Sequence, residues 1–165
     1  MRYPIIITAL LALSSCGGGG TAEQANQAAP APALKAVQTA ALTGLYEGGS
    51  GEARNQLCIL DRAGSDSRFG LVVWGANLHS CSGTGSAARD GDTLRLSMAG
   101  DESCAIEARI DGNGAVTLPD SLPEGCAYYC GAQASLAGAD FAKVGGTAQD
   151  AARATDLVGD PLCGG

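Results

Sequence analysis

The chain has 165 residues and a formal charge of −7, with 10 Lys and Arg against 17 Asp and Glu. This excess of carboxylates argues against nucleic acid as a partner, because nucleic-acid binding needs basic residues that neutralise phosphates. It argues equally against electrostatic docking on anionic lipid. The length suits one domain, and the presence of only two Phe and one Trp predicts a thin hydrophobic core.

The first 15 residues, MRYPIIITALLALSS, have the layout of a secretory signal. Arg2 makes a positive end, and the apolar run from Ile5 to Leu13 is too short to cross a hydrocarbon core, which needs about 20 residues. Small residues follow, as a cleavage site requires. We therefore expect residues 1–15 to be a signal peptide.

The stretch Leu13-Ser14-Ser15-Cys16 closely resembles the lipobox of bacterial lipoproteins, an apolar residue and two small residues before a cysteine. The resemblance implies that Cys16 takes a diacylglyceryl group, that signal peptidase II cuts before it, and that an acyl chain such as palmitate follows. Two or more acyl chains give a stable anchor, whereas one chain binds the membrane only marginally.

In enterobacterial members of this family an Asp after the cysteine holds the protein at the inner membrane. Gly17 in its place implies the outer membrane, facing the periplasm. The alternatives are a secreted protein cut near Cys16 and a short membrane segment that is not cleaved.

Residues 16–42 are rich in Gly, Ala, Gln and Pro and show no apolar periodicity until their end. Such a composition is typical of a flexible tether. We expect one lipidated N-terminal tether over 16–42, followed by a single globular domain over 43–165.

Six cysteines remain once Cys16 carries lipid, and an even number in an oxidising envelope indicates three disulfides. Their pairing stays open among the 15 connectivities that six cysteines allow. The last cysteine, close to the C-terminus, predicts a staple between the tail and the sheet. Cys126 and Cys130 have C-x3-C spacing, which fits neither a zinc site nor a thioredoxin-like C-x2-C motif. The disulfide candidates are Cys58, Cys81, Cys104, Cys126, Cys130 and Cys163.

Short apolar or alternating segments with turn signals between them predict an antiparallel meander or a partly closed barrel. The strongest strand signal is FGLVVW at 69–74, and residues 93–98 and 104–110 alternate cleanly between apolar and polar side chains. Asp111-Gly112-Asn113-Gly114 is a hairpin signal, since Asn and Gly tolerate positive φ. The small, polar stretch 81–91 is expected to be a loop that ends in an Asp-Gly turn.

The pattern changes after residue 118. Thr147-Ala148-Gln149-Asp150 resembles a capping box with Asp for the usual Glu, so a helix is expected over 148–157. Gly159 and Pro161 would end it. We therefore predict an α+β fold, a small antiparallel sheet with C-terminal helical segments packed on it and stapled by disulfides.

No catalytic set is apparent in the sequence. His79 is the only histidine, and it sits in a polar segment without an identifiable acid to orient it. The acidic pairs Asp90/Asp92 and Asp101/Glu102 are expected to be turn residues, since they lack the EF-hand pattern. We expect no catalytic residue, no metal and no cofactor.

The opening Gly44-Leu45-Tyr46-Glu47-Gly48 loosely resembles the first strand of calycin-like barrels. If the sheet closes, Tyr46 and Trp74 are the aromatic residues expected to line a ligand cavity, with plain core packing as the alternative. Tyr128 and Tyr129 either cover the sheet or offer a contact surface.

The tether, the stapled domain and the missing catalytic set favour a non-catalytic envelope lipoprotein that binds an envelope protein or the cell wall. A carrier of small apolar ligands is the alternative, and an enzyme is the least favoured reading. The membrane would be reached through the lipid anchor, and no nucleic acid is expected as partner.

Overall fold

The structure is a computed structural model that describes residues 41–50 and 53–163. The predicted signal peptide, Cys16 and nearly all of the predicted tether lie outside these residues. Within the described part of the chain, no helix combines the length and the apolar character needed to cross a membrane.

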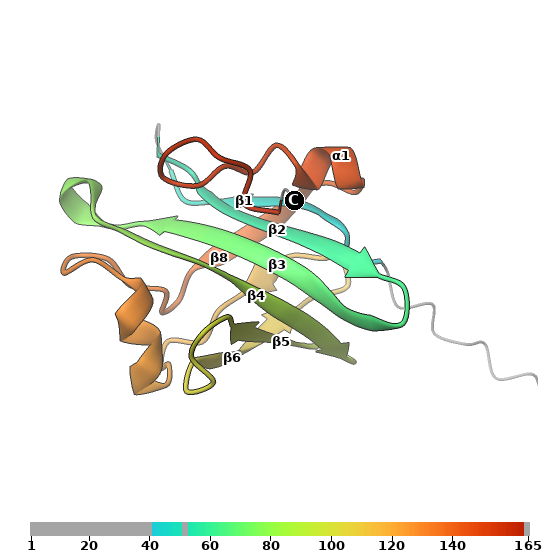
Figure 1. Cartoon of the computed structure of the whole chain (residues 1–165), viewed down its shortest axis with the longest axis horizontal. Coiled ribbons are helices and arrows are strands. Elements are labelled where there is room, and N and C mark those ends of the chain that lie inside the picture. The colour runs from blue at the N-terminus through green and yellow to red at the C-terminus, as the bar shows by residue number, and fades with distance from the viewer. Residues whose placement is uncertain (1–40, 51–52, 164–165) are drawn as a thin grey trace, which may run out of the picture. The chain divides into compact units, whose positions relative to one another are not determined.

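Eight antiparallel strands follow one another around a closed barrel, each paired with its neighbours in sequence, and β1 pairs with β8 to close the ring (Figure 1). The predicted antiparallel meander is therefore confirmed, and the barrel is fully closed. The strands are β1 (Gly44–Gly48), β2 (Asn55–Arg62), β3 (Ser65–Trp74), β4 (Ser80–Asp90), β5 (Thr93–Met98), β6 (Ala105–Ile110), β7 (Val116–Thr117) and β8 (Asp140–Gly145).

The predicted turns form at the glycines that the sequence indicates. Gly91 between β4 and β5 has φ 59° and Gly114 between β6 and β7 has φ 84°, a region that side chains other than glycine rarely occupy. Asp111 Oδ1 accepts hydrogen bonds from the backbone N–H of Asn113 and Ala115 at 2.8 and 2.9 Å. These local bonds fix the β6–β7 hairpin and hence the register of both strands.

Side chains fill the barrel interior. Strands β5 and β6 alternate as predicted, with Leu94, Leu96, Ile106 and Ile110 at most 1% exposed. The largest interior side chains are those of Tyr46, Phe69 and Phe141. An eight-stranded barrel is just wide enough for its side chains to fill it, and this one has a packed core despite its few aromatic residues.

The C-terminal tail packs on the outside of the barrel rather than forming a helical layer. Ala151, Ala154 and Leu162 of the tail join Leu45 and Val72 of the wall in a second apolar cluster. Cys163 bonds to Cys58 of β2, which confirms the predicted staple between tail and sheet.

The helix expected over 148–157 is only α1 (Ala148–Ala151), so the α+β prediction overstates the helical content. The capping box at its start is confirmed, since Thr147 and Asp150 exchange both hydrogen bonds. Beyond α1 the chain is extended at Thr155, whose N–H donates to the Gln56 side chain at 3.1 Å, and it then turns at Asp156, whose side chain accepts hydrogen bonds from the N–H groups of Val158 and Asp160. The other helical turns are η1 (Ala76–Leu78) and η2 (Glu124–Tyr129).

The loop expected over 81–91 was wrong, because residues 80–90 form β4, the longest strand. β4 pairs with β3 from Ser80 to Ala87 and with β5 from Gly85 to Asp90. Small residues suit two inward-facing positions of this strand, because a Cβ on Gly85 would lie 2.0 Å from the Ser97 carbonyl oxygen and one on Gly83 would meet the side chains of Met98 and Tyr129.

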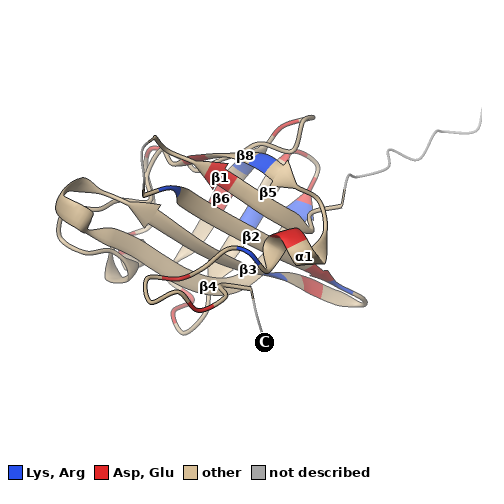
Figure 2. Cartoon of the chain, turned by 90° about the horizontal axis from the view of Figure 1, so that it is seen from above, with Lys and Arg blue, Asp and Glu red and all other residues tan. Residues whose placement is uncertain are grey.

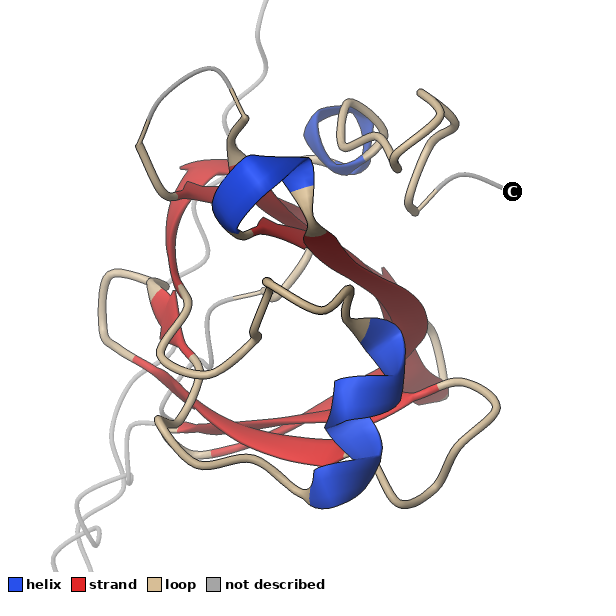
Figure 3. Ribbon diagram, turned by 90° about the vertical axis from the view of Figure 1, so that its left-hand side faces the viewer, coloured by secondary structure: helices blue, strands red, loops and turns tan. Residues whose placement is uncertain are grey.

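The connections divide between the two ends of the barrel. One end, here called the hairpin end, carries the turns β2–β3, β4–β5 and β6–β7. The other end carries the connections β1–β2, β3–β4, β5–β6 and β7–β8. We call it the capped end, because the long β7–β8 connection with η2 lies over it (Figure 3).

Candidate functional site

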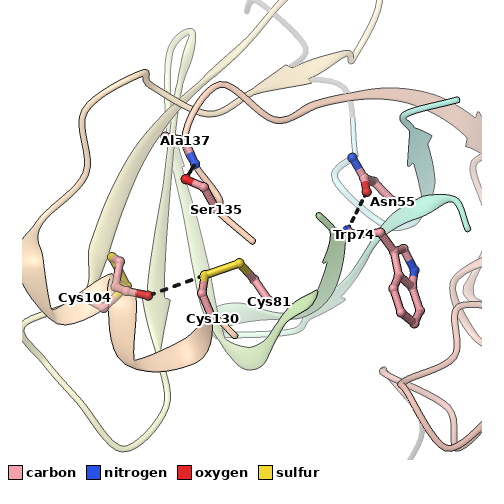
Figure 4. Close-up of a disulfide and its surroundings, with 8 residues drawn as sticks. Asn55, Trp74, Cys81, Cys104, Cys130, Ser135 and Ala137 are labelled. Atoms are coloured by element: carbon pink, nitrogen blue, oxygen red, sulfur yellow. Dashed lines mark hydrogen bonds between the residues drawn. A yellow bond between two sulfur atoms is a disulfide. The ribbon is translucent and has the colours of Figure 1, made fainter. Parts of the chain in front are cut away.

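Two disulfides hold the helix η2 against the capped end. Cys126 within η2 bonds to Cys104, next to the start of β6. Cys130, directly after η2, bonds to Cys81 of β4, and the two residues also form an isolated antiparallel bridge (Figure 4). With Cys58–Cys163 these are the three predicted disulfides. The segment that covers the capped end is therefore fixed to the barrel at two points of a short helix.

The two tyrosines of η2 have different surroundings. The Tyr129 hydroxyl donates a hydrogen bond to the Ala99 carbonyl at 2.9 Å, and its ring lies against the position of Gly83 in β4. Tyr128 is 84% exposed, and its ring meets that of Tyr129 edge to face with centroids 5.5 Å apart. Tyr129 thus anchors the pair to the barrel, and Tyr128 presents a large aromatic side chain to solvent.

A second exposed apolar side chain lies at the same end, in the β3–β4 connection. Leu78 is 79% exposed, and both Asn77 and Leu78 have positive φ, at 54° and 60°. For a residue as large as Leu this conformation is a genuine outlier. The Asn77 amide donates to the Gln133 side chain at 2.7 Å, and Ala76 N–H donates to the Gln133 carbonyl at 3.1 Å. These bonds tie the strained turn to the segment that follows η2.

A groove of about 430 Å³ runs between η2 and the chain after it. Apolar side chains and backbone form most of its wall, and Glu124 supplies a carboxylate. Its lining residues are Leu122, Pro123, Glu124, Cys126, Ala127, Cys130, Gly131, Ala132, Ala134, Ser135, Leu136 and Ala137.

The hairpin end is closed by the start of the folded chain. The Tyr46 hydroxyl donates to the Leu42 carbonyl at 2.5 Å, and Lys143 Nζ donates to the Ala41 carbonyl at 2.7 Å. Lys143 also lies 5.4 Å from the centre of the Tyr46 ring. Burial raises the pKa of Tyr46 to about 12, with a further contribution from the negative charge of Asp61. Tyr46 is therefore a neutral hydrogen-bond donor at any physiological pH.

Asp61 at the end of β2 holds the same N-terminal segment. Its carboxylate accepts hydrogen bonds from Ser67 Oγ at 2.7 Å and from Thr43 N–H at 3.1 Å. Partial burial alone would raise the pKa of Asp61, but these hydrogen bonds outweigh it and lower the pKa. Tyr46, Asp61 and Lys143 thus hold residues 41–43 in place.

The two aromatic residues predicted to line a cavity lie on opposite sides of the barrel wall. Tyr46 is fully buried in the interior core. Trp74 packs against the outer cluster beneath the tail, and its indole projects away from the Cys81–Cys130 disulfide (Figure 4). The backbone N–H of Trp74 donates a hydrogen bond to Asn55 Oδ1 at 2.8 Å. The structure does not bring the two rings together.

The other candidate residues of the sequence lie in turns and connections between strands. His79 follows η1, and its ring lies beside Gly131. Asp90 and Asp92 flank the β4–β5 turn, and Asp101 and Glu102 lie in the β5–β6 turn. Among the described residues, no three His, Cys, Asp or Glu side chains are grouped closely enough to hold a metal ion.

Sequence reasoning singled out Tyr128 and Tyr129 but missed Leu78. An isolated leucine between Asn77 and His79 gives no signal of its own, because its exposure depends on a backbone conformation that the β3–β4 turn imposes. The disulfides of Cys104 and Cys130 were expected without their partners, so the joining of η2 to two different strands was not foreseen.

No protein-family model matches this chain, and searches of curated proteins and of solved structures give no significant match. Its function is therefore inferred from its own residues.

Proposed function

We propose that this protein is a lipid-anchored, non-catalytic binding module of the bacterial envelope, and that it contacts a protein or cell-wall partner through its capped end. The lipobox-like residues 13–16 support the anchor. The observation that carries the binding role is Tyr128, 84% exposed on a helix held by two disulfides. Tyrosine gives a large contact area at low cost in conformational entropy, and a surface fixed before binding loses little freedom on association.

The packing of the interior favours this reading over a small-ligand carrier. Eight-stranded barrels can hold one small ligand, but here Tyr46, Phe69 and Phe141 occupy the interior, each at most 1% exposed. A carrier of this fold would need to displace them. A small molecule retained in native mass spectrometry of the full chain would favour the carrier instead.

The anchor is tested by the mass of the protein from its own membranes. We expect an N-terminal Cys16 with acyl chains attached, and no membrane-bound product from a Cys16→Ser variant, because only the cysteine sulfur accepts the first lipid. Release of the chain into the soluble fraction should be nearly complete in that variant. An unlipidated mature chain that still fractionates with the membrane would contradict the anchor and leave the binding role standing.

The binding face is tested by photo-crosslinking in living cells. A photoreactive phenylalanine analogue replaces Tyr128 in one strain and Val158 in another. Val158 is the matched control, since it is 82% exposed but lies in the C-terminal tail. We expect a discrete adduct from position 128 only. Equal adducts from both positions would indicate random collision.

With the adduct identified, Tyr128→Ala should weaken binding by about thirtyfold, the loss of about 2 kcal/mol that marks an interface hot spot. The midpoint of unfolding should not change, because the ring is already in solvent. Val158→Ala should change neither quantity. Calorimetry of the captured partner with each full chain measures the effect, and unaltered affinity of the Tyr128→Ala chain would place the interface elsewhere.

A further inference from the structure

Charge is distributed unevenly over the described surface. Three of the four connections at the capped end, residues 75–79, 99–104 and 118–139, contain no Lys or Arg. They contain four carboxylates, those of Asp101, Glu102, Asp120 and Glu124. The fourth connection, 49–54, is described only in part, and its Arg54 pairs with Glu47 at 3.0 Å.

Elsewhere the described chain mixes both signs. Arg95 of β5 pairs with Glu107 of β6, and Arg153 of the tail pairs with Asp150 at 2.8 Å. Figure 2 shows Lys and Arg positions on strands of the barrel wall, whereas the β3–β4 turn with η1 carries no charged position. The capped end thus differs from the rest of the described surface in that its charged side chains are almost all negative.

Two of these carboxylates lie beside the apolar features of that end. Glu124 lines the 430 Å³ groove beside Leu122 and Leu136. Tyr129 donates its hydrogen bond to Ala99, in the same β5–β6 connection as Asp101. Desolvation raises the pKa of the Tyr129 hydroxyl, and the negative charge of Asp101 raises it further. Glu102, Asp120 and Glu124 are exposed. An apolar groove and an aromatic ring therefore share one face with several carboxylates.

We propose that the partner of the capped end is a basic protein segment, in which Lys or Arg side chains accompany an apolar residue. This inference rests on the proposed binding role and names the class of its partner. Lys and Arg bury their aliphatic stems against apolar surface while the charged head stays in water, which suits a groove with apolar walls and one carboxylate. A cation over the exposed face of Tyr128 gains a further cation–π attraction. An anionic wall polymer would be repelled by the same carboxylates.

The test compares two variants with the same change of charge. The face variant combines Glu102→Gln, Asp120→Asn and Glu124→Gln. The control variant combines Asp66→Asn, Asp90→Asn and Asp92→Asn, three exposed carboxylates outside the capped end. Both variants lose three negative charges, so a difference between them reports on location and not on net charge. Equal unfolding midpoints would show that neither set disturbs the barrel.

The probe is a displayed library of random peptides, selected on the immobilised full chain and then resynthesised singly. We expect enrichment of Lys or Arg next to aliphatic or aromatic residues, and affinities that fall as salt is added. The face variant should bind these peptides about tenfold more weakly and the control variant within about twofold, since exposed pairs each contribute only modestly.

Selection of peptides without basic residues, equal binding by the two variants, or no enrichment at all would each overturn the inference. Those outcomes are separable from failure of the proposed function. If Tyr128→Ala still loses the partner captured in cells while the face variant keeps it, the binding role holds and only the basic character of the partner is wrong.

Discussion

Replacing both Cys58 and Cys163 with alanine is expected to lower the free energy of unfolding by about 4–5 kcal/mol, a large part of the roughly 5–15 kcal/mol that stabilises a typical domain. This disulfide closes the longest loop, with a sequence separation of 105 against 49 and 22 for the other two. The entropy that a crosslink removes from the unfolded chain grows with loop length. Both cysteines are nearly buried, at 0% and 3% exposed.

The matched control is the Cys104→Ala/Cys126→Ala chain, whose bridge closes the shortest loop and should cost about 3 kcal/mol. Urea denaturation of both full-length variants gives the comparison. A second readout is local. The tail carries Arg153, whose side chain is 62% exposed, and release of the tail should open it to trypsin. If the chain without Cys58–Cys163 were the more stable of the two and resisted trypsin at Arg153, the tail would be held by packing alone.

The number of disulfides followed from the sequence, but their pairing did not. The sequence indicates that Cys163 pins the tail because it lies near the C-terminus, whereas its partner depends on which strand passes beneath the tail. That strand is β2, where Cys58 faces outward between the inward-facing Leu57 and Ile59. Side-chain alternation in a closed barrel therefore selects the pair, and the closure itself could not be read from the sequence.

The strands that were predicted are those with strong local signals. β5 and β6 alternate, and their neighbouring turns carry Asp-Gly and Asn-Gly pairs that need positive φ. β4 was missed because Ser, Gly and Thr dominate it, and Gly is depleted in strands. The proposed binding face could be anticipated from the sequence only in part, for a related reason. Tyr128 stands out in the sequence, but the exposure of Leu78 and the grouping of carboxylates depend on which connections share one end.

The glycines of β4 give the second large effect. A Cβ on Gly85 would lie 2.0 Å from the Ser97 carbonyl oxygen and 2.8 Å from Cε1 of Phe69. The first neighbour is backbone of β5, which cannot turn aside, and the second is a fully buried ring of the core. Gly85→Val should therefore lower the free energy of unfolding by about 3 kcal/mol or more, the range in which overpacking leaves no low-strain arrangement.

Ser86→Val is the control one residue along the same strand. Ser86 faces outward and is half-buried, and valine has a high strand propensity, so the change in unfolding free energy should stay within about 0.5 kcal/mol. Thermal unfolding of the two full chains makes the comparison. If Gly85→Val unfolded at the midpoint of Ser86→Val, then β4 and β5 would not approach as closely as the barrel requires. The contact between the Gly83 position and Tyr129 would then be overturned as well, and with it the support of η2 on which the proposed binding face depends.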